Sequence, residues 1–245
     1  MCKNKSIIKI FIIILITIII INLIFIVNTT SKKKILYLTI DDCPSPDFKK
    51  KIEYLIENNI EATFFCTGIT MDNYKEELGF AISNGYDIEN HSFSHPHFSE
   101  ISLEEIKSEI YKTDKIIEDV YRDANIERTH KFFREPYGDK MYFQIKKRRE
   151  VNNYLRSLGY IKPKIKTFTF IDLLYPKDVG VFWTANIKEY ELSKEMTLTR
   201  LDKILNKNKN QIILIHDHKR TTDVFYEIIE KFLKSEIEIR SLDMN

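Results

Sequence analysis

The sequence predicts an α/β fold, a parallel sheet covered by helices, preceded by one transmembrane helix. Three observations support this prediction. Short apolar runs alternate with longer amphipathic stretches from Ile35 onward, several of these runs end directly in polar residues, and residues 10–27 carry no charge. Strands that alternate with helices are typical of parallel sheets, because each helix returns the chain to the start of the next strand.

The expected strands are short and apolar. They cover residues 35–40, 62–66, 86–89, 130–133, 179–183, 211–215 and 237–239. The expected helices lie between them, at residues 48–58, 74–84, 102–123, 141–158, 198–206 and 223–234. The pattern from Ser102 to Glu105 is that of a capping box, which marks the start of the third helix. Residues 161–178 are expected to form a long loop.

The N-terminal region predicts a membrane anchor. Residues 10–27 are uncharged, rich in isoleucine and long enough to span a bilayer, and no small-residue cleavage pattern follows them. We therefore expect a short tail at 1–9, an uncleaved signal anchor at 10–27, a basic linker at 28–34 and one domain at 35–245. Lysines flank the anchor almost equally, and the amino terminus favours an inside tail, so we expect a single-pass protein whose domain lies outside the cytoplasm.

Composition limits the classes of function. The chain has 245 residues, 43% of them hydrophobic, and a formal net charge of +2 from 38 basic and 36 acidic residues. A balanced charge of this kind argues against nucleic-acid binding, which favours a basic domain. No feature predicts an oligomer, and we expect a monomer.

Two histidines have the spacing of metal ligands. His91 and His95 lie four residues apart, and on one helical turn they would face the same way. Asp42 follows an expected strand and could add a carboxylate. Two histidines and one carboxylate leave coordination positions open, as catalytic metal sites require. The alternative is that both histidines occupy a solvated loop or a satisfied position in the core.

Asp41 and Asp42 are adjacent at the end of the first expected strand. Along an extended chain their side chains would point in different directions. One could then bind the metal while the other takes a proton from the attacking water. The alternative is a simple turn, because Asp-Asp-Cys-Pro has turn composition.

These motifs resemble those of one known family. The runs Leu38-Thr-Ile-Asp-Asp-Cys-Pro44, His91-Ser-Phe-Ser-His95, Arg134-Glu-Pro-Tyr-Gly138 and Ile213-Leu-Ile-His216-Asp are similar, in order and spacing, to those of the NodB-type polysaccharide deacetylases, carbohydrate esterase family 4. The resemblance extends from Ile35 to the C-terminal end. It implies a distorted (β/α) barrel of about seven strands.

The resemblance also implies a metal-dependent reaction centre. It assigns the role of general base to Asp41 and the metal triad to Asp42, His91 and His95. Arg134 resembles the arginine that orients the base. The ion is expected to be Zn²⁺, although Co²⁺, Ni²⁺ or Mn²⁺ could use the same ligands.

Further residues resemble those that contact the substrate or the leaving group. His216 resembles the general acid, and Glu189 stands where the family has an aspartate that tunes this acid. Tyr137 resembles the residue whose backbone N–H holds the oxyanion. Leu214 and Trp183 resemble residues around the pocket for the acetyl methyl group.

Two positions depart from the family pattern. Cys43 replaces a usual glycine, and it could be a metal ligand, an oxidation-prone thiol, a partner of Cys66 or an inert buried residue. Glu189 is one methylene longer than aspartate, so its hydrogen bond to His216 is not assured.

The resemblance implies a hydrolase of carbon–nitrogen bonds that removes N-acetyl groups from a glycan containing N-acetylhexosamine, such as peptidoglycan or a chitin-like polymer. Two alternatives stay open. The same chemistry could act on a non-sugar amide or an O-acetyl ester, or the domain could bind glycans without catalysis.

Overall fold

The computed structural model describes residues 34–165, 167, 170–235 and 237–242. The expected tail at 1–9, the expected anchor at 10–27 and the linker up to residue 33 lie outside these residues. Within the described ranges, no helix is both long and apolar enough to cross a membrane. The domain itself begins at Ile35.

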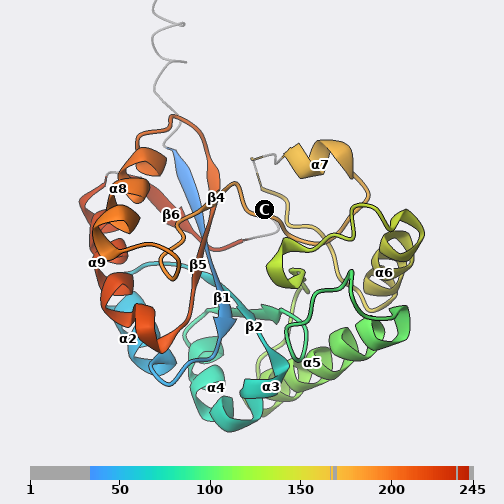
Figure 1. Cartoon of the computed structure of the whole chain (residues 1–245). Helices are drawn as coiled ribbons and strands as arrows, with labels where there is room; N and C mark the ends of the chain where they lie inside the picture. The colour runs from blue at the N-terminus through green and yellow to red at the C-terminus, as the bar shows by residue number, and fades with distance from the viewer. Residues whose placement is uncertain (1–33, 166, 168–169, 236, 243–245) are drawn as a thin grey trace, which may run out of the picture. The chain divides into compact units, whose positions relative to one another are not determined.

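A parallel sheet forms the centre of the domain (Figure 1). Its strands are β1 (Ile35–Cys43), β2 (Thr63–Cys66), β3 (Asp87–Asn90), β4 (Ala185–Asn186), β5 (Gln211–His216) and β6 (Glu238–Arg240). The order is β3-β2-β1-β5-β4, with β6 also paired to β1, and every pair is parallel. The predicted parallel α/β sheet is confirmed.

Irregular segments continue the sheet from β3 round toward β4. Phe133 forms an isolated bridge to Asn90 of β3, where a strand was expected at 130–133. On its other side, the Phe133 carbonyl accepts a hydrogen bond from the backbone N–H of Val181 at 2.8 Å. The chain from Val181 then leads into β4, which pairs with β5. The described part of the chain therefore has six strands and these connecting segments in place of about seven regular strands.

No regular strand forms at 179–183, and the prediction of one was wrong. Side-chain donors occupy carbonyl groups that a neighbouring strand would otherwise use. Lys140 Nζ lies 3.1 Å from the Gly180 carbonyl, and Arg134 Nε lies 3.2 Å from the Val181 carbonyl. Backbone groups that bond to side chains are lost from a regular ladder.

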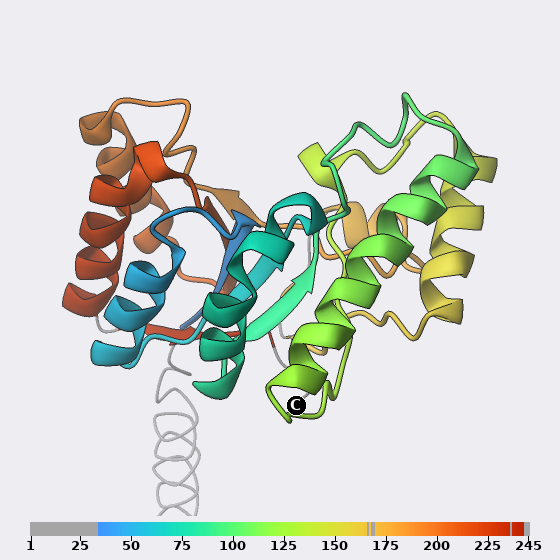
Figure 2. The same cartoon turned by 90° about the horizontal axis from the view of Figure 1, so that it is seen from below.

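Helices surround the sheet. They are α2 (Phe48–Glu57), α3 (Gly68–Met71), α4 (Lys75–Ser83), α5 (Leu103–Asp123), α6 (Ile145–Ser157), α7 (Phe170–Leu174), α8 (Lys194–Leu205) and α9 (Thr222–Lys234), with 3₁₀ turns η1 (Asp72–Tyr74), η2 (Pro136–Gly138) and η3 (Lys219–Thr221). Neighbouring contacts link α8, α9, α2, α4, α5 and α6 in that order (Figure 2). The expected capping box at Ser102 and Glu105 is present, and α7 lies within the expected loop.

The two faces of β1 have different roles. Leu36, Leu38 and Ile40 pack into the large core beneath the helices, whereas Tyr37 belongs to a smaller cluster on the opposite face. Because side chains alternate along a strand, Asp41 lies on the same face as Tyr37. β1 pairs with β5 so that Asp41 is level with His216. The register therefore sets residues from the two ends of the domain side by side.

Candidate active site

Asp41 is held by a buried arginine. Its Oδ1 lies 2.6 Å from Arg134 Nη1, which also donates to Thr39 Oγ1 at 2.9 Å. The Arg134 guanidinium stacks over Phe65 with its Cζ 4.2 Å from the ring centroid. Both charged side chains are almost fully buried. An arginine fixed at several points is well suited to hold the Asp41 carboxylate in one orientation.

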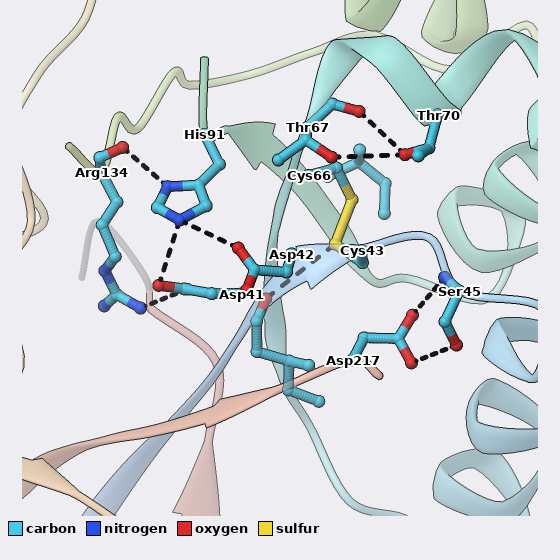
Figure 3. Close-up of a disulfide and its surroundings, with 12 residues drawn as sticks. Asp41, Asp42, Cys43, Ser45, Cys66, Thr67, Thr70, His91, Arg134 and Asp217 are labelled. Carbon is cyan, nitrogen blue, oxygen red and sulfur yellow. Dashed lines mark hydrogen bonds and ion pairs between the residues drawn. A yellow bond between two sulfur atoms is a disulfide. The ribbon is translucent and has the colours of Figure 1, made fainter. Parts of the chain in front are cut away.

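Asp42 turns toward the same site as Asp41. The pairing of β1 with β2 shifts register between Asp41 and Cys43, and Asp42 has a φ of 63°. Aspartate tolerates this left-handed conformation better than most residues. The expectation that the two carboxylates diverge was therefore wrong, because a bulge breaks the alternation. Figure 3 shows both carboxylates directed toward His91.

His91 and His95 come together through a loop and not through the helical turn that the spacing predicted. The chain between them is non-helical, and Ser92 and His95 have φ angles of 67° and 60°. The two Nε2 atoms nevertheless lie 3.2 Å apart. The predicted convergence of the pair is present, although its local structure differs.

Asp42, His91 and His95 could hold a metal ion. Their ligand atoms all lie within 4.8 Å of one another. Asp42 Oδ1 is buried without a hydrogen-bond partner, 3.5 Å from His91 Nε2 and 3.2 Å from His95 Nε2. His91 Nδ1 bonds to the Arg134 carbonyl at 2.8 Å, which leaves Nε2 as the ligand atom. This donor set fits a divalent cation such as zinc.

The protonation states of two ligands also suit a metal. Burial opposes ionisation of Asp42, but the imidazole rings of His218, His91 and His95 beside it hold its pKa well below the ordinary value. Burial and the nearby charge of His91 lower the pKa of His95 to about 4. Asp42 is therefore a carboxylate and His95 a neutral imidazole near neutral pH, as metal ligation requires.

His218 is a member of the site that the sequence did not indicate. Its side chain is 42% exposed. Its Nε2, however, lies 3.3 Å from Asp42 Oδ2, the oxygen that does not face the two histidines. No spacing pattern connects His218 with Asp42, because β1 and the loop after β5 meet only in the folded sheet.

His216 is anchored by Glu189. The Glu189 Oε1 atom accepts hydrogen bonds from the His216 backbone N–H at 2.5 Å and from Nδ1 at 2.9 Å. Burial acts to lower the pKa of His216, but the bond to Glu189 and the charges of Glu189, Asp41 and Asp42 outweigh it and raise the pKa above its ordinary value. The substitution of glutamate for the family's aspartate therefore leaves the carboxylate–histidine contact in place.

The remaining predicted residues line one cavity with the site. This cavity has a volume of about 960 Å³. Its lining includes Tyr137, Trp183, Leu214 and His216, together with Asp41, Asp42, His91 and His95. Tyr137 is 59% exposed, whereas Leu214 is buried. Trp183 packs directly over Gly138, where a Cβ atom would lie 2.7 Å from the indole ring. An aromatic wall of this kind can contact a sugar ring.

Two further contacts hold the loop behind the site (Figure 3). Cys43 and Cys66 form a disulfide between the ends of β1 and β2, so the pairing left open by the sequence is present. Asp217 accepts hydrogen bonds from the backbone N–H and the hydroxyl of Ser45, both at 2.7 Å. Lys51 forms a buried ion pair with the same carboxylate. The bulge at Asp42 is thus supported from both sides.

Comparisons with known proteins agree with this geometry. Residues 28–161 match the family described as polysaccharide deacetylase. The chain is 33% identical over 116 residues to a peptidoglycan-N-acetylglucosamine deacetylase from Bacillus cereus, a match that covers 47% of this chain and 40% of that protein. It is 29% identical over 204 residues to the peptidoglycan-N-acetylmuramic acid deacetylase PdaC from Bacillus subtilis, covering 81% of this chain and 36% of PdaC. The chain therefore spans less than half the length of these relatives.

A solved structure shares the fold over most of the domain. The structure of the peptidoglycan deacetylase PdaC from Bacillus subtilis aligns with a TM-score of 0.63 at 25% identity, covering 86% of this chain and 89% of that chain. The family match covers more than half of this sequence and includes the Asp41–Asp42, His91–His95 and Arg134 motifs. The chain belongs to the polysaccharide deacetylase family.

Proposed function

We propose that the chain is a metal-dependent hydrolase that removes N-acetyl groups from a glycan containing N-acetylhexosamine. The observation that carries this proposal is the grouping of the Asp41–Arg134 pair, the Asp42, His91 and His95 cluster and His216 around one cavity. A base, a metal site and an acid together can hydrolyse an amide bond. The relatives named above are described as peptidoglycan deacetylases, which supports a cell-envelope glycan as substrate.

In the proposed reaction each residue acts at one atom. Asp41 removes a proton from the attacking water, and Arg134 holds its carboxylate in one orientation. His216 donates a proton to the departing amine through Nε2, because Nδ1 is engaged by Glu189. A backbone N–H at Tyr137 would stabilise the oxyanion. Leu214 and Trp183 would contact the acetyl methyl group.

A divalent ion is part of the proposal. Asp42, His91 and His95 would hold it, and when bound it supplies Lewis-acid polarisation of the acyl carbonyl and activation of water. Zn²⁺ suits two imidazoles and one carboxylate best, while Co²⁺, Ni²⁺ and Mn²⁺ can use the same ligands.

We also propose that residues 10–27 anchor the chain in a bilayer, with the domain outside the cytoplasm. The uncharged stretch supports the anchor. The Cys43–Cys66 disulfide supports the location, because disulfides persist in oxidising compartments and are rare in the cytosol.

Acetate release tests the proposed function. The full-length protein, loaded with Zn²⁺ or Co²⁺, is expected to release acetate from N-acetylglucosamine oligomers or peptidoglycan, and Asp41→Asn is expected to abolish release while metal still binds. Full activity in Asp41→Asn would contradict the assigned base. Turnover of small amides or O-acetyl esters alone would favour the alternative substrates, and glycan binding without turnover would favour a non-catalytic relative.

A further inference from the structure

The cavity that contains the candidate site has an uneven distribution of charge along its lining. Beyond Asp41 and Asp42, its lining contains one carboxylate, Glu191, and five basic side chains. The basic residues are Lys188, Arg200, Lys203, Lys207 and Arg220. Glu191 is already engaged, because Lys188 Nζ lies 2.6 Å from its carboxylate. The other four basic groups therefore face the cavity without an acid in its lining to neutralise them.

Three of these cations come from one face of α8 and its continuation. Arg200 and Lys203 are three residues apart on α8, which places them on one side of the helix, and Lys207 follows two residues after its end and lines the same cavity. Arg200 Nε donates to the Asn186 carbonyl of β4 at 2.7 Å, which fixes its guanidinium beside the cavity. Among the described residues, no carboxylate forms an ion pair with any of these three side chains.

The other side of α8 differs. Lys194 forms an ion pair with Glu227 of α9, and Asp202 lies 2.6 Å from Lys231 of α9. Asp202 thus pairs with α9, whereas Arg200, Lys203 and Lys207 line the cavity. Cations near a helix C-terminus also interact favourably with the helix dipole, which could account for Lys203 and Lys207. That effect does not account for Arg200 in the helix interior or for Arg220, which comes from η3.

We infer that this basic wall, formed by Arg200, Lys203, Lys207 and Arg220, binds an acidic group of the glycan. The inference rests on the proposed function and narrows its substrate to an anionic glycan. The acidic group would be a carboxylate or a phosphate on the N-acetylhexosamine or on a neighbouring sugar, because both accept charge-assisted hydrogen bonds from guanidinium and ammonium groups. A neutral chitin-like chain would leave these four charges without an acidic partner.

Matched substrates test the inference. The first probe is a tetrasaccharide of alternating N-acetylglucosamine and N-acetylmuramic acid. The second is the same tetrasaccharide with its lactyl carboxyls converted to neutral methyl amides. The third is a chitotetraose that carries a 6-phosphate, compared with plain chitotetraose. The full-length protein is expected to show a higher kcat/KM for an acidic probe than for its neutral counterpart, and this ratio should fall as salt is added. A higher kcat/KM for the first probe than for the second identifies a carboxylate as the bound group. A higher kcat/KM for the 6-phosphate chitotetraose than for plain chitotetraose identifies a phosphate.

Charge-removing variants locate the effect. Lys203→Gln/Lys207→Gln is expected to lower the acidic-to-neutral ratio of kcat/KM by about twofold to tenfold, because it removes two exposed charges, each worth up to about fivefold. Arg200→Gln should lower it further. The matched control is Lys146→Gln/Arg149→Gln on α6, which removes the same charge from exposed positions outside this cavity and should leave the ratio unchanged. An equal effect of the control, or equal rates on acidic and neutral probes, would overturn the inference.

A binding measurement separates this inference from the proposed function. Calorimetry on the full-length Asp41→Asn variant compares affinity for the acidic and neutral tetrasaccharides without turnover. Tighter binding of the acidic tetrasaccharide than of the neutral one supports the basic wall if adding Lys203→Gln/Lys207→Gln weakens it. This result would hold even if the native protein released no acetate. In that case the proposed function alone fails. Equal affinity for both forms overturns the basic wall, whatever the activity of the native protein.

Discussion

One oxygen of Glu189 accepts two hydrogen bonds from His216, from the backbone N–H and from Nδ1 of the ring. The Glu189 carboxylate thus contacts both the backbone and the ring of one residue. Because Nδ1 donates its proton to Glu189, Nε2 is the ring atom that can exchange a proton with substrate. The contact fixes the position of the ring and raises its pKa.

The first prediction concerns pH. A general acid works while it carries its proton, so kcat/KM falls as pH rises through the pKa of His216. Glu189 raises this pKa, and Glu189→Gln is therefore expected to move the alkaline limb of the kcat/KM profile to lower pH. The control is Glu195→Gln, which removes the same charge from an exposed position on α8 outside the cavity and should leave the limb in place. An unchanged limb in Glu189→Gln would contradict the role of Glu189.

The second prediction concerns metal affinity. His218 contacts the Asp42 oxygen that faces away from the two histidines, so it should hold this carboxylate in its ligating orientation. Loss of such supporting contacts typically costs about 10-fold to 100-fold in metal affinity. We expect His218→Ala to weaken Zn²⁺ binding in calorimetry by about 10-fold. His97→Ala is the control, since His97 stacks on Tyr137 and contacts no metal-type ligand.

The third prediction concerns the disulfide. Cys43 and Cys66 are separated by 23 residues, and closing a loop of this size should stabilise the fold by about 3 kcal/mol. We expect Cys43→Ala/Cys66→Ala to lower the free energy of unfolding by this amount in urea melts. Dithiothreitol should reproduce the loss in the native protein and have no effect on the double variant. A native protein insensitive to the reductant would argue against the bond.

The fourth prediction concerns the buried ion pair. Arg134→Met would leave the buried Asp41 carboxylate without its cation, and breaking a buried pair in this way costs about 3–5 kcal/mol. We expect a loss of stability of this size in urea melts, together with loss of acetate release. Arg149→Met on α6 should change stability by less than about 0.5 kcal/mol, because its side chain is exposed. Equal stability of both variants would refute the prediction.

Sequence patterns predicted the regular elements well where local chemistry defines them. The capping box at Ser102 and Glu105 correctly marked the start of α5, because both hydrogen bonds involve neighbouring residues. The apolar run that became β5 was also located to within one residue. In contrast, the segment at 179–183 is apolar enough for a strand, but Arg134 and Lys140 bond to its carbonyls. Contacts between residues so distant along the chain cannot be read from a local pattern.

The site was predicted in the same uneven way. Motif order indicated that Asp41, Asp42, His91 and His95 would meet, and the structure brings them together. The backbone conformation that brings them together was not predictable from periodicity. Asp42 has a left-handed conformation that breaks the alternation of the strand, and His95 has one that breaks the expected helical turn. His218 was missed because its partner lies across the sheet.

The pairing of β1 with β5 has a consequence for biosynthesis. Asp41 sits early in the domain and His216 close to its end, yet their backbones are level in neighbouring strands, and the Asp217 N–H donates to the Asp41 carbonyl at 2.8 Å. During synthesis Asp41, the cluster of Asp42, His91 and His95, and Arg134 are all translated well before β5 leaves the ribosome. A nascent chain therefore carries an incomplete reaction centre until almost the whole domain has been synthesised. Premature termination before Gln211 would yield a product that lacks β5 together with the proposed proton donor.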